Sequence, residues 1–181
     1  MKKILPMLLL SCATLSIAGA ASAASGDDAA YSAAKNQAKA DYKVAHEKCT
    51  ALKGNPKDVC VAETKAARER TEETAEAEYK NTDNARAHAR KEIAQADYKV
   101  AKAKCDALKG NDNDVCVKNA KAAEITAKAN ATADKKVSAA RTDATEDKRK
   151  AEYKVELEKC DAMAGPAKDA CVARAKTTYG K

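Results

Sequence analysis

Six of the seven cysteines are spaced in a way that favours local disulfide bonds. They form three pairs, each eleven positions apart: Cys49 and Cys60, Cys105 and Cys116, Cys160 and Cys171. The C-x10-C spacing differs from the C-x-x-C spacing of zinc sites and thioredoxin-like motifs. The midpoint of each pair falls beside a glycine, so both cysteines of a pair are equally far from an expected turn. We therefore predict the three structural disulfides 49–60, 105–116 and 160–171.

The alternative chemistry for these cysteines is metal binding or redox catalysis, with His46 as the nearest further ligand. His46 lies one turn before Cys49, but the equivalent positions in the other copies are Lys102 and Leu157. A ligand that the fold required would be expected to recur in every copy. We assign no metal, cofactor or catalytic residue. The second hypothesis is a periplasmic metal- or stress-responsive binding protein that uses His46 and the thiols when they are reduced.

The cysteine pairs belong to a sequence repeat that occurs three times. The copies are ADYKVAHEKCTALKGNPKDVCVAETKAA from Ala40, ADYKVAKAKCDALKGNDNDVCVKNAKAA from Ala96 and AEYKVELEKCDAMAGPAKDACVARAKTT from Ala151. Each copy is expected to be a helical hairpin, with turns at 54–57, 110–113 and 165–168. A glycine in the left-handed conformation is expected to end the first helix of each hairpin, and Asn55 and Asn111 to cap the helix that follows.

The composition between the turns favours long helices with a thin core. Residues 24–181 contain 39 Ala and only 14 Leu, Ile or Val, and the chain has no Trp and no Phe. The intervals 58–109 and 113–164 contain neither Gly nor Pro. Each interval could therefore form one helix of roughly 50 residues, about 75 Å long.

A heptad spacing predicts which side of these helices is buried. Tyr42, Ala45, Cys49 and Leu52 are spaced by three, four and three, and the spacing recurs as Tyr98, Ala101, Cys105 and Leu108 and as Tyr153, Glu156, Cys160 and Met163. The tyrosines are expected to cover the hairpins rather than to bind a ligand.

Two polar segments, 81–84 and 130–134, are poor in helix propensity and are candidate breaks. Unbroken helices would bring the short first and last helices together into a four-helix bundle at one end of a rod, whereas breaks would give three stacked hairpins. The predicted fold class is thus all-α: three disulfide-closed hairpins in an elongated antiparallel coiled-coil rod or bundle.

The N-terminus has the pattern of a secretory signal peptide, residues 1–23. Met1-Lys2-Lys3 precedes a short apolar run, and Ala21-Ser22-Ala23 fits the cleavage site. Cleavage would leave 32 basic and 27 acidic residues, a net charge of +5, and no transmembrane segment is expected in the mature chain 24–181. The alternative is lipoprotein processing with an acylated Cys12. The predicted location is periplasmic or secreted.

No catalytic motif emerges from the sequence. It contains no G-x-S-x-G, H-E-x-x-H, Gly-rich phosphate loop or calcium-loop pattern. Basic and acidic residues are interleaved instead of forming a basic stripe with aromatic platforms, so no nucleic-acid partner is expected. The sequence predicts a non-enzymatic structural or interaction protein, a spacer, scaffold or adaptor of the cell envelope. Its expected partner is another envelope protein or a second copy of itself.

The repeated phrases YKVAKAKCDALKGNDNDVCVKNAKAA and YKVELEKCDAMAGPAKDACVARAK also carry a resemblance. They resemble a group of uncharacterised exported Ala/Lys-rich helical repeat proteins of Gram-negative bacteria, sometimes labelled TolA-like. The repeat phrases cover most of residues 40–181. The resemblance implies export, and it implies no particular activity.

Overall fold

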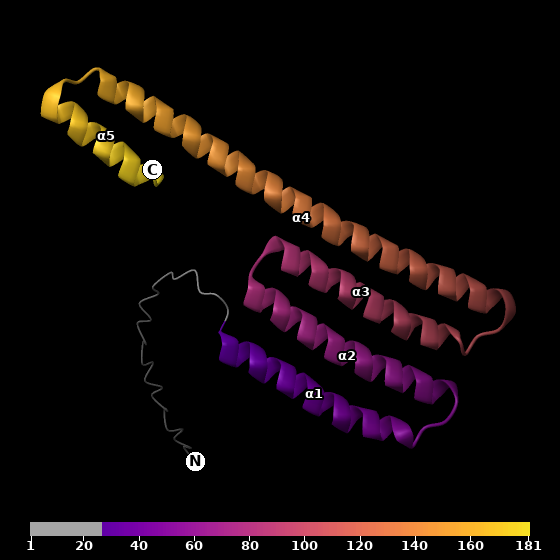
Figure 1. Ribbon diagram of the computed structural model, residues 1–181. Coiled ribbons are helices and arrows are strands. Elements are labelled where there is room, and N and C mark those ends of the chain that lie inside the picture. The colour runs from indigo at the N-terminus through magenta and orange to yellow at the C-terminus, as the bar shows by residue number, and fades with distance from the viewer. Residues whose placement is uncertain (1–26) are drawn as a thin grey trace, which may run out of the picture.

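The computed structural model describes residues 27–181, so the predicted signal peptide, 1–23, and Cys12 lie outside the described residues. The described chain forms α1 (Asp28–Thr50), α2 (Asn55–Lys80), α3 (Asp83–Cys105), α4 (Gly110–Asp161) and α5 (Gly165–Tyr179). Each of these helices packs only against the helix before it and the helix after it. The described part is therefore all-α and built from antiparallel hairpins, as the sequence predicts (Figure 1).

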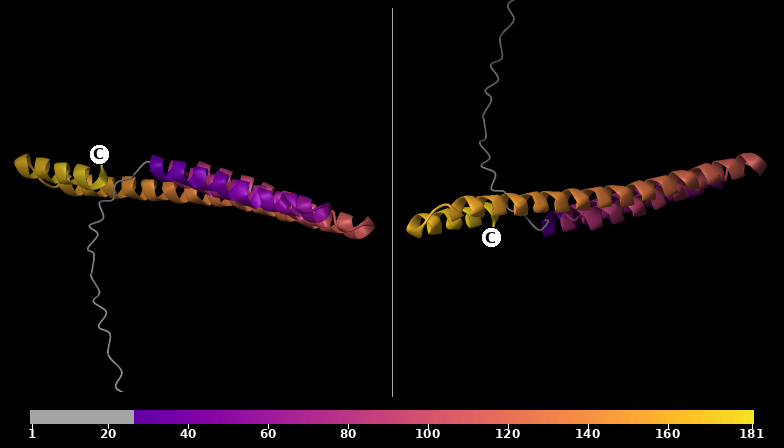
Figure 2. Two further views of the ribbon diagram at one scale, coloured as in Figure 1. Left: turned by 90° about the horizontal axis from the view of Figure 1, so that it is seen from below. Right: turned by 90° about the horizontal axis from the view of Figure 1, so that it is seen from above.

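The helices form a thin layer with one long extension. α1, α2, α3 and the first half of α4 lie side by side, and the layer is seen edge-on in both views of Figure 2. α4 has 52 residues, or about 78 Å at 1.5 Å per residue, and continues beyond the layer until α5 folds back along its far end (Figure 1). The four-helix bundle that two unbroken helices would give is not formed, because the first interval is broken and α5 contacts only α4.

The two polar segments behave differently. Asn81 adopts a left-handed φ of 44° and ends α2, and Thr82 caps α3 by accepting a hydrogen bond of 3.1 Å from the Ala85 amide. The segment 130–134 stays inside α4. In the second copy the residues equivalent to this break are 137–140, Val-Ser-Ala-Ala, which offer no residue suited to the left-handed conformation. Only the first of the two long intervals is therefore divided into two helices.

The three disulfide-closed turns share a geometry that differs from the predicted one. The amides of Leu52, Leu108 and Met163 donate to the carbonyls of Cys49, Cys105 and Cys160 at 3.1, 2.8 and 3.0 Å. These bonds form a tight turn at the end of the earlier helix. The residues between the two helices of each hairpin are therefore 51–54, 106–109 and 162–164, mostly before the expected turns at 54–57, 110–113 and 165–168. Gly54, Gly110 and Gly165 do have positive φ, of 60°, 56° and 59°. They lie at the start of the following helix, where this conformation redirects the chain, and not at the end of the preceding one.

The core of the described part consists of alanine and cystine. Its buried apolar residues are Ala38, Cys49, Ala66, Ala75, Ala77, Ala87, Ala89, Ala94, Ala96, Cys105, Ala131, Cys160 and Ala175. Small side chains let helices approach closely but bury little area. The predicted heptad seam is correct at its cysteines and wrong at Leu52, Leu108 and Met163, which lie past the helix ends and are exposed.

Candidate functional site

All six paired cysteines form disulfides, with the predicted pairing. Cys49 is joined to Cys60, Cys105 to Cys116 and Cys160 to Cys171, each with a Cα–Cα distance of 5.6 Å. The first cysteine of each pair is fully buried at the end of its helix. Equal spacing from the turn places the two cysteines at the same height in the hairpin, and the disulfide then joins neighbouring helices without displacing either of them.

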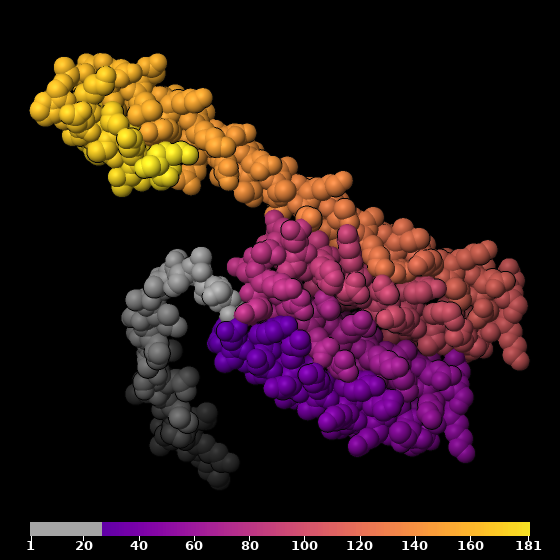
Figure 3. All heavy atoms as spheres, in the orientation of Figure 1, coloured from indigo at the N-terminus to yellow at the C-terminus, as the bar shows by residue number. Residues whose placement is uncertain are grey.

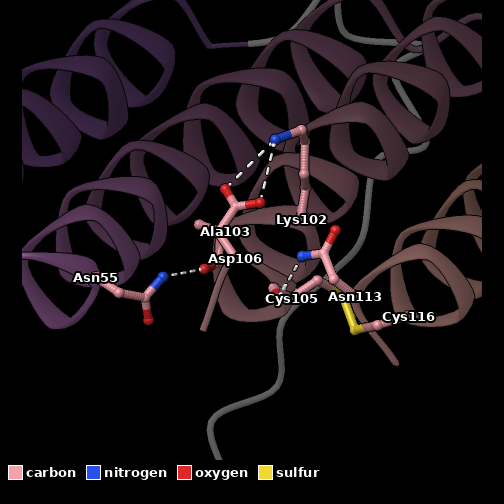
Figure 4. A network of polar contacts seen from close by, with 7 residues as sticks. All are labelled: Asn55, Lys102, Ala103, Cys105, Asp106, Asn113 and Cys116. Atoms are coloured by element: carbon pink, nitrogen blue, oxygen red, sulfur yellow. Dashed lines mark hydrogen bonds and ion pairs between the residues drawn. A yellow bond between two sulfur atoms is a disulfide. The ribbon is translucent and has the colours of Figure 1, made fainter. Parts of the chain in front are cut away.

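Asparagine side chains support the disulfide at the end of α3 (Figure 4). Asn113 of α4 donates its side-chain amide to the Cys105 carbonyl at 2.7 Å, and Asn55 of α2 donates to the Ala103 carbonyl at 2.6 Å. Carbonyls of the last helical turn have no partner within the helix, so Asn55 supplies one to the Ala103 carbonyl. The Asn113 bond is a second one to the Cys105 carbonyl, which also accepts from the Leu108 amide. The capping roles predicted for Asn55 and Asn111 are wrong, because neither α2 nor α4 has a side-chain capping bond.

The repeated tyrosines each pack on the other helix of their own hairpin. The Arg68 guanidinium lies 5.3 Å from the ring centroid of Tyr42, and the Lys121 ammonium 4.9 Å from that of Tyr98. Tyr153 packs instead against the ring of Tyr179. All three repeated tyrosines are half-buried. These contacts agree with a role in covering the hairpins.

In the described chain neither histidine has a free thiol beside it, because all six described cysteines are in disulfides. His46 stacks on Tyr42 with ring centroids 5.3 Å apart, and its nearest predicted co-ligand, Cys49, is in a disulfide. The His88 Nδ1 atom lies 3.4 Å from an Oε2 atom of Glu73. Across residues 27–181, no group of three or more His, Cys, Asp or Glu side chains is arranged to hold a metal ion. The metal-binding hypothesis requires reduced thiols, and this disulfide-bonded form leaves it a prediction.

A buried carboxylate in α4 was not singled out by the sequence. Glu124 is buried and accepts hydrogen bonds of 2.6 Å from both Lys121 and Lys128. These bonds, with that from Lys121 the larger effect, hold the pKa of the Glu124 carboxyl below its ordinary value although burial opposes them. The Glu124 bond in turn raises the pKa of Lys121. The spacing of the lysines, three residues before and four residues after Glu124, was the signal in the sequence. The cluster joins three side chains of α4.

The hollow beside His88 contains one close ion pair and one buried carboxylate oxygen, Oε2 of Glu73, that has no hydrogen-bond partner in the described chain. It is lined by Glu73, Glu76, Lys80, Thr82, Asn84, Ala85 and His88 at the junction of α2 and α3. The Lys80 ammonium lies 2.6 Å from Glu76, which lowers the pKa of the Glu76 carboxyl.

Comparison with known proteins adds no assignment to this geometry. No family model, curated protein or solved structure matches the chain. Among the described helices, none is both long enough and apolar enough to cross a membrane. What the chain does is therefore inferred from the arrangement of its own residues.

Proposed function

We propose that the protein is an exported, non-enzymatic spacer, scaffold or adaptor of the cell envelope. The observation that carries this proposal is the continuous α4, which belongs to two disulfide-closed hairpins, α3–α4 and α4–α5. The α1–α2 and α3–α4 turns lie at one end of the described molecule and the α4–α5 turn lies at the other (Figures 1 and 3). A helix of 52 residues holds these ends about 78 Å apart.

The middle of α4 supports a connecting role. Ser138 lies beside Asp83 of α3, and Arg149 bonds to the Tyr179 carbonyl of α5. Every residue of the stretch 139–148 between them is exposed. This stretch consists of small and charged residues, so within one copy of the chain it contributes length and helical continuity.

The disulfides support export. Three local disulfides persist in an oxidising compartment and are rare where thiols are kept reduced. Together with the signal-peptide pattern at residues 1–23, they favour the periplasm or the exterior as the site of action.

The experiment is site-specific photocrosslinking in intact cells. A photoreactive residue replaces Lys53 in the first turn or Ala164 in the third, and Thr142 in the middle of α4 is the matched control. A spacer that bridges envelope components gives crosslinks from both turn positions and few from Thr142. Deleting residues 139–145 shortens α4 by about 10 Å and should reduce capture at Ala164, whereas replacing the same residues with a seven-residue Ala/Glu/Lys helix should not.

Two results would contradict the proposal. One is an unprocessed protein that stays in the cytoplasm with all seven of its cysteines as free thiols. The other is an exported protein whose crosslinks are as frequent from Thr142 as from the two turns.

A further inference from the structure

We propose that two copies of this chain associate through the outer edge of α4, as an antiparallel pair related by a two-fold axis. The outer edge is the side of α4 turned away from α3 and α5. Its apolar residues are Val115, Ala122, Ala129, Ala133, Val137, Ala140, Ala144, Ala151 and Val155, and all are exposed. This self-association goes beyond the spacer role and does not depend on it.

The first half of the outer edge repeats a surface that α2 buries. A shift of 56 residues, which relates Cys60 to Cys116, makes Ala122 equivalent to Ala66 and Ala133 equivalent to Ala77. Ala66 and Ala77 are 4% and 8% exposed and lie on the α3 side of α2, among the residues that pair with α3. Ala122 and Ala133 are exposed. α4 therefore presents without a partner the surface that α2 packs against α3.

The second half repeats the complementary surface of α3. A shift of 55 residues, which relates Cys105 to Cys160, makes Ala144 equivalent to Ala89 and Ala151 equivalent to Ala96. Ala89 and Ala96 are 4% and 1% exposed, whereas Ala144 and Ala151 are exposed. Each half of α4 thus carries, exposed, the equivalents of two alanines that the α2–α3 contact buries.

The straightness of α4 decides which halves can meet. α2 and α3 fold onto each other because the chain reverses at Asn81, where φ is 44°. α4 has no such break, so its own two halves cannot meet. The first half of one copy can instead pair with the second half of another copy, which is the relationship of domain swapping.

The α2–α3 register gives the geometry of the pair. The ion pairs Arg70–Asp97 and Lys104–Glu63 join α2 and α3 across their contact. Transferred to α4, this register places the two-fold axis near Ser138 and brings Ala133 of one copy opposite Ala144 of the other.

Charge and space are compatible with this pairing. Lys118, near one end of the outer edge, comes close to Glu158 of the second copy, and the symmetry repeats this attraction. α3 and α5 both contact the opposite side of α4, so neither obstructs a second α4. The result is a closed dimer, because each copy uses the same surface.

The test is sedimentation equilibrium of the oxidised protein and of matched charge variants. The wild type is expected to sediment at twice the mass of its chain. In A133E/A144E, glutamates of the two copies oppose one another, so the dimer should weaken at least tenfold. In A133K/A144E, each lysine faces a glutamate of the other copy, so this variant should remain the more dimeric of the two. A139E, on another side of α4, is the control and should leave the dimer unchanged.

A fourth variant tests the domain-swapping relationship itself. V137N/S138T/A139D/A140N introduces the residues of the first break into α4, and its second half is then expected to fold back on the first. The product should be a monomer with a smaller Stokes radius than a monomer of the A133E/A144E protein. Because all four positions are outside the disulfide turns, peptide mapping should still return the three native disulfides.

The proposal is overturned by a wild-type protein that is monomeric across the dilution series, or by a dimer that A133E/A144E leaves intact. An assembly that grows beyond two copies would overturn the closed symmetry. Equal dissociation of A133E/A144E and A133K/A144E would overturn the antiparallel register.

Discussion

The ring of Tyr179 in α5 lies against the ring of Tyr153 in α4, with ring centroids 6.0 Å apart. One hydrogen bond accompanies this contact, from the Arg149 guanidinium to the Tyr179 carbonyl at 3.1 Å. α5 has only 15 residues and no other helical partner in the described chain. Helices of this length are marginal alone, so the third hairpin relies on its disulfide more than the others do.

Removing the third disulfide should release α5. In C160S/C171S we expect the amides of residues 165–179 to lose most of their protection from hydrogen exchange, because closing a loop of this size contributes about 3 kcal/mol. The measurement is hydrogen exchange followed by mass spectrometry of oxidised protein. C105S/C116S is the control: α3 and α4 should stay paired because their contact extends along the whole of α3. Equal loss of protection in the two variants, each around its own missing disulfide, would contradict the greater dependence of the third hairpin on its disulfide.

Asn81 should tolerate glycine and resist β-branched residues. Its φ of 44° is left-handed, which costs a β-branched side chain about 1–2 kcal/mol and costs glycine little. N81V should therefore unfold at lower urea concentration than N81G, as followed by far-UV circular dichroism. N130V, in the polar segment that stays helical, is the control and should change stability by less. Identical midpoints for N81V and N81G would be inconsistent with the left-handed link.

Glu124 should contribute to the pH dependence of stability. Because the pKa of its carboxyl is lowered in the folded chain, its contribution is present above the unfolded pKa and is lost as the pH falls through the folded pKa. E124Q should therefore show a smaller drop in Tm than the wild type between neutral and acid pH. E146Q is the control, since Glu146 is exposed and its nearest lysine nitrogen is 3.6 Å away. An unchanged acid dependence in E124Q would contradict this role.

Processing should produce a mature chain that begins at Ala24. Mass spectrometry of protein isolated from the envelope should find this N-terminus without lipid, because Ala21-Ser22-Ala23 fits the cleavage site. An A23L variant should accumulate as the unprocessed precursor, since a large residue at this position blocks cleavage, whereas S22A should be processed normally. An acylated Cys12 at the N-terminus would show lipoprotein processing instead.

The disulfides could be predicted because their signal is symmetry about a turn, and that symmetry survives any packing of the helices. The choice between the two polar segments was harder, because both have poor helix propensity. A signal was present at Asn81-Thr82, where a residue suited to ending one helix precedes a capping residue for the next. Asn130 is followed by Ala131, which continues a helix.

The layered arrangement could not be read from the sequence. Seams made of alanine have similar shapes, so the residues of one seam do not select a particular partner helix. The same limit applies to Glu124: the spacing of its two lysines was visible, whereas its burial beside α3 depends on how α4 packs. Leu52, Leu108 and Met163 were predicted to be buried and are exposed, because the heptad was continued past the ends of the helices.

Packing between chain neighbours alone also determines how the molecule can assemble during synthesis. In the described chain α2 needs only α1 and α3, α4 needs only α3 and α5, and no helix waits for a distant segment. Folds with such low contact order form quickly. Each hairpin can therefore close, and its disulfide can be oxidised, while the following repeat is still emerging from a translocation channel. The regular spacing of the cysteines then limits mispairing, because each cysteine finds its partner before the next pair becomes available.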